Sequence, residues 1–121
     1  MEDSNYMEKR KYMQVSEIKG VFLSEEGGYF DSRGGWQRVW NSDVLDNNMA
    51  NSKVAQISIS TNNMAGTLRG LHALKLELQE TKTVHCFKGS SFHVIVDIRP
   101  ESSTFLDYFA VILIGEKNQR V

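Results

Sequence analysis

SFHVIVDI, residues Ser91 to Ile98, is the stretch that decides the fold of this chain. Its apolar and polar residues alternate, and successive side chains of a β-strand point to opposite faces of a sheet. One face would then be wholly apolar, and we expect it to form the core stripe: Phe92, Val94, Val96 and Ile98. The opposite face would carry Ser91, His93, Ile95 and Asp97. The pattern predicts a half-buried strand.

Other short alternating stretches lie on both sides of this one, separated by turn-forming clusters of Gly, Asn, Asp, Ser and Pro. We predict strands in residues 13–23, 36–40, 54–60, 67–71, 81–87 and 105–114. Residues 74–79 show the only helical spacing, and that run is too short for a stable helix, so we expect a loop with one turn. Many short strands indicate an all-β fold, a β-sandwich or jelly roll.

Length and charge narrow the class further. With 121 residues the chain suits one domain, which we place at residues 13–121 behind a flexible, mostly polar N-terminus of residues 1–12. The formal net charge of −1 gives no global field for binding nucleic acid or an anionic membrane. The chain does not begin with an apolar signal segment, and we interpret its single cysteine, Cys86, as a buried thiol. We therefore expect a cytoplasmic protein.

The functional residue types gather in three ordered motifs. DSRG occupies Asp31 to Gly34, RGLH occupies Arg69 to His72, and Lys82 follows ten residues after His72. Together with the later VDIRPESSTF segment, residues 96–105, these motifs resemble the dTDP-4-dehydrorhamnose 3,5-epimerase family in order and spacing. The resemblance covers most of the chain from about Tyr29 onward, and it implies a cupin-like jelly roll.

The resemblance also implies roles for five residues. His72 would be the base that removes a carbon-bound proton beside the 4-keto group of a dTDP-linked 4-keto-6-deoxy sugar, and Lys82 would stabilise the enolate. An imidazole suits proton abstraction because its ordinary pKa of about 6.5 is close to working pH. Arg33 and Arg69 would bind the diphosphate or sugar oxygens, with Tyr29 as a further substrate contact. The family implies no cofactor and a homodimer.

Spacing raises one geometric question about RGLH. Arg69 and His72 are three residues apart, so a regular strand would point them to opposite faces. Gly70 lies between them, and a glycine inside a strand often marks a bulge that re-aims the following side chain. We therefore predict a bulge at Gly70 that brings both side chains to one pocket.

The sequence departs from the family pattern in and after these motifs. Ala73 and Leu74 replace an aromatic residue and Gln, His93 stands where Asp is usual, and Arg38 replaces an acidic residue. The family pattern continues beyond the position of Val121, so we expect this chain to stop before the fold is complete. It would then lack the family's catalytic tyrosine and the aspartate that orients the base, with open sheet edges and reduced activity.

Three alternative functions remain. A metal-binding cupin is disfavoured, because no second histidine follows His72 and Glu77 alone completes no ligand set, so we expect no metal. A sugar-nucleotide 3,4-ketoisomerase is suggested by the RGLHA run, Arg69 to Ala73. A non-catalytic nucleotide-sugar binding or subunit module would keep the cations without turnover. The role of Arg33 has a structural alternative as well: instead of binding substrate, it would pair with Asp31 in a surface turn.

Overall fold

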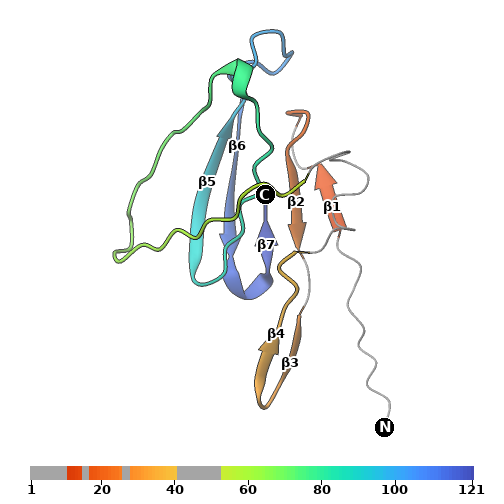
Figure 1. Ribbon diagram of the computed structural model, residues 1–121, viewed down its shortest axis with the longest axis vertical. Helices are drawn as coiled ribbons and strands as arrows, with labels where there is room; N and C mark the ends of the chain where they lie inside the picture. The colour runs from red at the N-terminus through yellow and green to blue at the C-terminus, as the bar shows by residue number, and fades with distance from the viewer. Residues whose placement is uncertain (1–10, 15–16, 26–27, 41–52) are drawn as a thin grey trace.

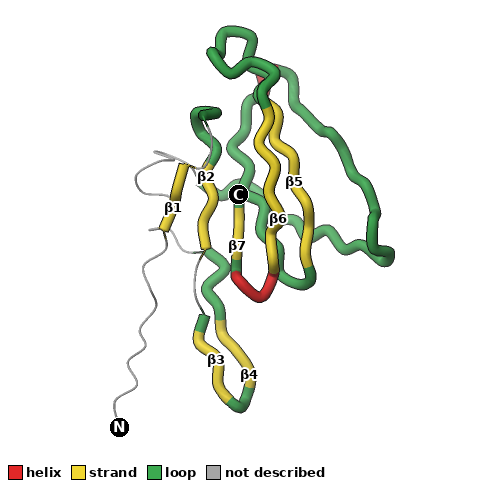
Figure 2. Tube along the Cα trace, turned by 180° about the vertical axis from the view of Figure 1, so that it is seen from behind, coloured by secondary structure: helices red, strands yellow, loops and turns green. Residues whose placement is uncertain are grey.

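The computed structural model describes residues 11–14, 17–25, 28–40 and 53–121. The regular secondary structure of these residues is mainly β-strand, and its helical elements are single 3₁₀ turns (Figures 1 and 2). In chain order the elements are β1 Lys11–Gln14, β2 Phe22–Glu25, β3 Tyr29–Asp31, β4 Gly34–Trp36, η2 Leu76–Leu78, β5 Ser90–Val96, β6 Tyr108–Ile114, η3 Gly115–Lys117 and β7 Gln119–Arg120. The predicted all-β class is confirmed.

The strands form three antiparallel groups. β1, β2 and β7 make one sheet in that order, β3 pairs with β4, and β5 pairs with β6. In Figure 2 the β3–β4 hairpin extends beyond the end of the β1–β2–β7 sheet, and η3 turns the chain from β6 into β7. The C-terminal strand therefore completes a sheet that the first strands of the chain begin.

The β5–β6 hairpin is the longest paired region that the structure describes. Its register is continuous from Ser90 opposite Ile114 to Val96 opposite Tyr108. The connecting turn is closed by Asp97, whose carboxylate accepts hydrogen bonds from Arg99 (Nε, 2.8 Å), Ser102 (Oγ, 2.6 Å) and Thr104 (Oγ1, 2.7 Å). The expected ion pair between Asp97 and Arg99 is confirmed. These hydrogen bonds to a buried carboxylate hold the turn in one conformation.

The predicted core stripe on β5 is wrong. Phe92 is 67% exposed, Val94 and Ile98 are exposed as well, and Val96 is half-buried. The opposite face is the better covered, with Asp97 buried and Ser91, His93 and Ile95 half-buried. Both faces of the ribbon carry apolar residues, so alternation alone does not decide which of them packs against the rest of the chain.

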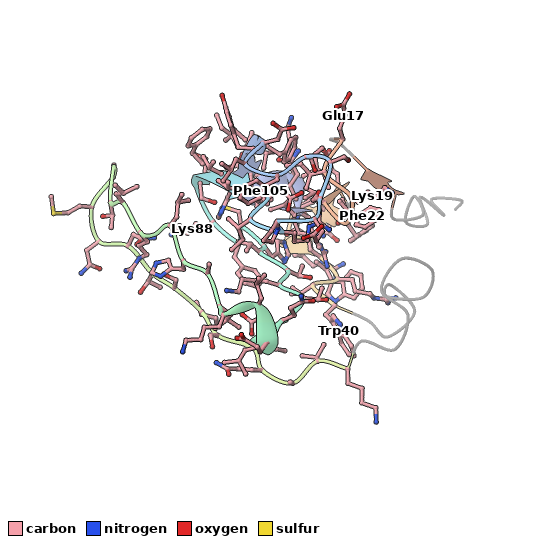
Figure 3. All side chains as sticks on the ribbon, turned by 90° about the horizontal axis from the view of Figure 1, so that it is seen from above. Glu17, Lys19, Phe22, Trp40, Lys88 and Phe105 are labelled. Atoms are coloured by element: carbon pink, nitrogen blue, oxygen red, sulfur yellow. The ribbon has the colours of Figure 1, made fainter. Side chains whose placement is uncertain are left out.

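Residues 53–83, which we call the arm, contain most of the other corrections. The predicted strands 54–60 and 67–71 do not form, and the predicted strand 81–87 is reduced to a single bridge between His85 and Arg120. Every residue of the arm is exposed. Figure 3 shows the arm as a wide loop beside the strands. A strand needs a backbone partner, and the described residues supply none along most of the arm.

The remaining boundaries shift by a few residues. The predicted strand 13–23 is divided between β1 and β2, the predicted strand 36–40 ends in β4 at Trp36, and β6 begins at Tyr108 rather than at 105. The single turn expected within 74–79 is η2. Of the N-terminus expected to be flexible, residues 1–10 lie outside the described residues. Within the described part of the chain, no helix is long and apolar enough to cross a membrane.

Cys86 is buried, as predicted, with 7% of its surface exposed. Its thiol lies 3.5 Å from the carbonyl oxygens of Lys88 and Gly89, which can accept its weak hydrogen bond. Burial among backbone carbonyls keeps this side chain away from solvent.

Candidate functional site

The β3–β4 hairpin carries two of the five candidate residues, Tyr29 and Arg33. Its two-residue turn, Ser32 and Arg33, follows Asp31, which accepts a hydrogen bond from the Arg33 backbone N–H at 2.9 Å. Gly34 closes the turn with a φ of +131°, a conformation that favours glycine. Asp31 and Gly34 therefore place Arg33 at the tip of the hairpin.

Asp31 also holds the Arg33 side chain. Nε of Arg33 donates to Oδ2 of Asp31 at 3.0 Å, and Nη2 donates to the same oxygen. The Arg33 guanidinium, together with its backbone N–H and a smaller contribution from Tyr29, holds the pKa of Asp31 below its usual range. Arg33 nevertheless remains 84% exposed. The turn pair expected on structural grounds is present, and it presents an oriented guanidinium to solvent.

The arm carries Arg69 and His72. Arg69 donates from Nε to Oδ1 of Asn62 at 2.8 Å and from Nη2 to the carbonyl oxygen of Thr61 at 3.3 Å. These bonds fold the arm back on itself between Thr61 and Arg69. The His72 imidazole is exposed and makes no hydrogen bond to any described residue.

Gly70 lies directly against His72. Its φ is +104°, and a Cβ added there would lie 3.1 Å from Cδ2 of the His72 ring. The predicted bulge is wrong, because no strand forms on either side of Gly70. The glycine still has a local use, since a side chain at this position would press on the imidazole.

Lys82 lies near the end of the arm and is also at the surface. Its Nζ is 3.2 Å from Oε1 of Glu80, and the two side chains are 63% and 52% exposed. An ion pair this exposed is worth at most about 1 kcal/mol. Lys82 can therefore leave Glu80 for a bound anion at little cost.

The structure brings the five candidates together only in part. Tyr29 and Arg33 share the hairpin, while Arg69 and His72 share one limb of the arm. Figure 1 shows the hairpin extending from the β1–β2–β7 sheet, whereas the arm crosses one face of the β5–β6 hairpin and loops out beyond β5. Among the described residues, no hydrogen bond or ion pair joins a candidate in the hairpin to a candidate in the arm.

Two other features lie apart from these residues. A shallow depression is lined by Glu17, Ile18, Leu106, Asp107 and Tyr108, and none of the candidates lines it. In the part of the chain that the structure describes, no three His, Cys, Asp or Glu side chains lie close enough together to hold a metal ion.

Comparison with known proteins identifies the architecture. A family model described as dTDP-4-dehydrorhamnose 3,5-epimerase matches residues 15–121. The chain belongs to this family. It is 33% identical over 102 residues to the dTDP-4-dehydrorhamnose 3,5-epimerase of Streptomyces griseus, covering 84% of this chain and 50% of that protein. The Escherichia coli K12 enzyme is 28% identical over 106 residues, covering 88% of this chain and 57% of the enzyme.

A solved structure extends the family match to the fold. The dTDP-4-dehydrorhamnose 3,5-epimerase of Bacillus anthracis str. Ames, crystallised with TDP and PPi bound, superposes with a TM-score of 0.81 at 28% identity. The match covers 92% of this chain and 63% of that one. The predicted cupin-like β fold is therefore confirmed, and the chain spans about half to three fifths of the lengths of the epimerases it matches.

His93 lies on the better covered face of β5. Its Nε2 is 2.8 Å from Oγ of Ser91, and burial lowers the pKa of the imidazole. The His93 side chain is therefore partly covered and held by a hydrogen-bonding contact with its neighbour on the same face of β5.

Residues that hold the hairpin in place were not predicted. Asn118 and Arg120 donate hydrogen bonds to the carbonyl oxygens of Arg38 and Val39, across about eighty positions of sequence. Side chains that bind backbone carbonyls leave no motif, because any residue supplies a carbonyl. Only the fold reveals such contacts.

Proposed function

We propose that this chain acts as the base-bearing portion of an epimerase that works beside the 4-keto group of a dTDP-linked 4-keto-6-deoxy sugar. The observation that carries the proposal is the superposition on the Bacillus anthracis epimerase that was crystallised with TDP and PPi bound. The RGLH run and Lys82 add the residue types that the chemistry needs. The same match supports a nucleoside diphosphate as the recognised group.

His72 is the proposed base. Its imidazole is exposed and accepts no hydrogen bond from a described residue, so a ring nitrogen is available to take the proton from the carbon beside the ketone. Gly70 leaves room beside the ring for a substrate to approach. The electron pair left on carbon then delocalises onto the ketone oxygen, forming an enolate.

Lys82 is the proposed partner of that enolate oxygen. Its ammonium group carries a full positive charge, and a donor placed where charge develops lowers a barrier by about 3–4 kcal/mol in measured cases. To act in this way it exchanges its exposed contact with Glu80 for the substrate oxygen. For both side chains to act on one sugar ring, the arm must also bring Lys82 and His72 close together.

Arg33, Arg69 and Tyr29 are the proposed substrate contacts. The Asp31 carboxylate orients the Arg33 guanidinium, which is 84% exposed and free to meet a diphosphate. Tyr29 interacts with both Asp31 and Arg33 and adds a phenol to the same surface. Arg69 sits three residues before His72, on the limb that carries the base.

Binding without turnover is the competing function. It is favoured by one observation: no carboxylate among the described residues orients the His72 imidazole, whereas general bases are usually oriented by a third group. The cations of the hairpin and the arm would still hold a nucleotide sugar.

Solvent deuterium incorporation separates the two functions. The protein would be incubated in D₂O with a dTDP-linked 4-keto-6-deoxy sugar, and exchange at the carbons beside the ketone followed by NMR. We expect exchange with the wild type and its loss in His72→Ala, while the matched variant His93→Gln retains it. Binding of dTDP without any exchange would establish the binding module instead.

We also propose that the protein works as a cytoplasmic homodimer. Phe92, Tyr108 and Ile112 form an exposed apolar patch on one face of the β5–β6 hairpin, with Phe92 opposite Ile112. A patch of this kind favours association. The buried lone cysteine suits a reducing compartment. Light scattering at micromolar concentration should give twice the chain mass, and a monodisperse monomer would contradict the dimer.

A further inference from the structure

Arg120 lies at the junction of three segments that are distant in sequence. Through its backbone it pairs with Ser24 of β2 on one side and forms a bridge with His85 on the other. The next residue extends the bridge, because Val121 and Val84 exchange two backbone hydrogen bonds of 2.7 and 3.0 Å. β7 and Val121 therefore attach the segment that directly follows the arm, Val84 and His85, to the β1–β2–β7 sheet.

The Arg120 side chain reaches the third segment, which is the limb of the β3–β4 hairpin that leaves β4. Nη1 donates to the carbonyl oxygen of Val39, and Nη2 donates to that of Arg38 at 3.4 Å. Asn118 donates from Nδ2 to the same Arg38 oxygen, also at 3.4 Å. Both donors are buried, with Arg120 4% exposed and Asn118 fully covered.

The other limb of the hairpin is held by the same C-terminal segment. Glu25, which precedes the hairpin, lies opposite Gln119 in the β2–β7 register and accepts a hydrogen bond from its side chain at 2.8 Å. On the limb that leaves β4, Gln37 also donates to the carbonyl oxygen of Glu116 at 3.4 Å. Residues 116–120 are thus hydrogen-bonded to the hairpin at both of its ends.

The chemistry of these contacts favours arginine. Burying a cation is costly unless its N–H donors have hydrogen-bond acceptors. Here the carbonyl oxygens of Val39 and Arg38 accept from two nitrogen atoms of the Arg120 guanidinium, whose planar shape fixes the angle between the two bonds. A lysine would offer one point of attachment and no fixed angle. Asn118 adopts the left-handed conformation, with a φ of 51°, which turns the chain from η3 into β7 so that both side chains reach the same limb.

We propose that Arg120, supported by Asn118, is a positioning residue that sets where the Arg33 hairpin lies relative to the Lys82 end of the arm. It touches neither substrate nor reacting atoms, and it acts through the two segments that it joins. Its catalytic consequence rests on the proposed function, in which Arg33 binds the diphosphate.

The first test measures position directly, without a ligand. Nitroxide labels at Ser32→Cys in the hairpin turn and Thr81→Cys near Lys82, in a Cys86→Ser background, report the distance between the two segments by pulsed electron paramagnetic resonance. We expect Arg120→Lys to broaden the distance distribution and the matched surface variant Lys117→Met to leave it unchanged. Equal distributions in the two variants would overturn the proposal. Should Arg120→Lys not fold, Asn118→Gly decides, since it keeps the left-handed backbone and deletes one donor.

The second test uses unlabelled protein and dTDP in a double-mutant cycle, measured by calorimetry. We expect Arg120→Lys to weaken dTDP binding by about threefold to tenfold, the range of one net hydrogen bond, and to have no further effect once Arg33→Ala is present. Equal losses with and without Arg33 would mean general destabilisation and would overturn the positioning role. If Arg33→Ala alone leaves dTDP affinity unchanged, the proposed function of Arg33 fails, and the distance measurement still decides the role of Arg120.

Discussion

The β5–β6 hairpin and the arm of residues 53–83 alternate apolar and polar residues in the same way, yet only the hairpin is paired. Each residue of β5 faces one of β6 in a continuous register, and the Asp97 network closes the turn between them. Every residue of the arm is exposed, and its alternating stretches have no strand beside them in the described part of the chain. Alternation indicates which residues are suited to a strand, but the strand forms only where a second strand is available to pair with it.

Distance along the chain explains the difference. β6 is the next strand after β5, so the hairpin closes across the local connection of residues 97–107, and less chain entropy is lost than in pairing with a distant segment. A partner for the arm has to come from elsewhere in the fold, because its own turn at Met64 to Gly66 does not pair the two limbs. The four predictions below test how far the hairpin and the arm differ in stability and in function.

The largest contrast concerns buried and exposed leucines. Leu113 in β6 has no exposed surface, whereas Leu68 in the arm is 89% exposed. We expect Leu113→Ala to lower the free energy of unfolding by about 2–5 kcal/mol and Leu68→Ala to change it by about 0.5 kcal/mol or less. Urea denaturation followed by tryptophan fluorescence measures both. Similar costs for the two variants would show that the arm packs in solution.

Two threonines make the next comparison. Thr104 is buried and donates to Asp97 at 2.7 Å, while Thr67 is exposed and donates to the carbonyl oxygen of Met64 at 2.8 Å. Replacing Thr104 with valine should lower the free energy of unfolding by about 1–2 kcal/mol, because it removes a buried hydrogen bond. Thr67→Val is the matched control and should cost about 0.5 kcal/mol or less. The same denaturation assay would refute this order if Thr67→Val cost more.

Acid should weaken the turn of the β5–β6 hairpin. Hydrogen bonds from Arg99 and Ser102, with a further one from Thr104, hold the pKa of Asp97 far below its ordinary value. A carboxylate whose pKa is depressed by folding stabilises the native state above its unfolded pKa of about 3.9, and this stability is lost as the pH falls. Thermal melts between pH 7 and pH 3 should therefore show a falling midpoint, with a shallower slope in Asp97→Asn.

Asp31 supplies the control for that experiment. Its pKa is also lowered, mainly by Arg33, but the pair lies on an exposed turn where solvent screens the interaction. Asp31→Asn should leave the slope of the melting midpoint against pH close to that of the wild type. An Asp97→Asn slope equal to the wild-type slope would contradict the assignment of acid sensitivity to this turn.

The smallest effect on stability is expected at two glycines of the arm. Gly70 and Gly66 both have positive φ, but only Gly70 has the His72 ring where a Cβ would stand. We expect neither Gly70→Ala nor Gly66→Ala to change the free energy of unfolding measurably, because the arm is not part of the packed structure. Deuterium exchange should fall about tenfold or more in Gly70→Ala alone, since displacement of a base by about 1 Å is costly. Equal exchange in the two variants would remove the link between Gly70 and His72.

The sequence predicted a local contact of one candidate residue better than the arrangement of the candidates. DSRG correctly indicated a surface turn that pairs Asp31 with Arg33, because the two side chains are two residues apart and meet locally. RGLH indicated a strand and a bulge, and both are wrong, because strand formation depends on a partner that the local sequence does not specify. The contacts of Arg120 with Arg38 and Val39 were not foreseen, since backbone carbonyls carry no sequence signal.

By itself, the sequence determined the all-β class, the β5 and β6 strands, the burial of Cys86 and the motifs that resemble the epimerase family. These depend on local alternation, on turn residues and on side-chain chemistry, which are written in neighbouring positions. Tertiary structure alone decided which face of β5 is covered, that β7 joins β2, and that one buried arginine links the hairpin to the end of the arm. Each of these depends on which distant segment supplies a backbone or apolar partner, and that choice is made by the chain as a whole.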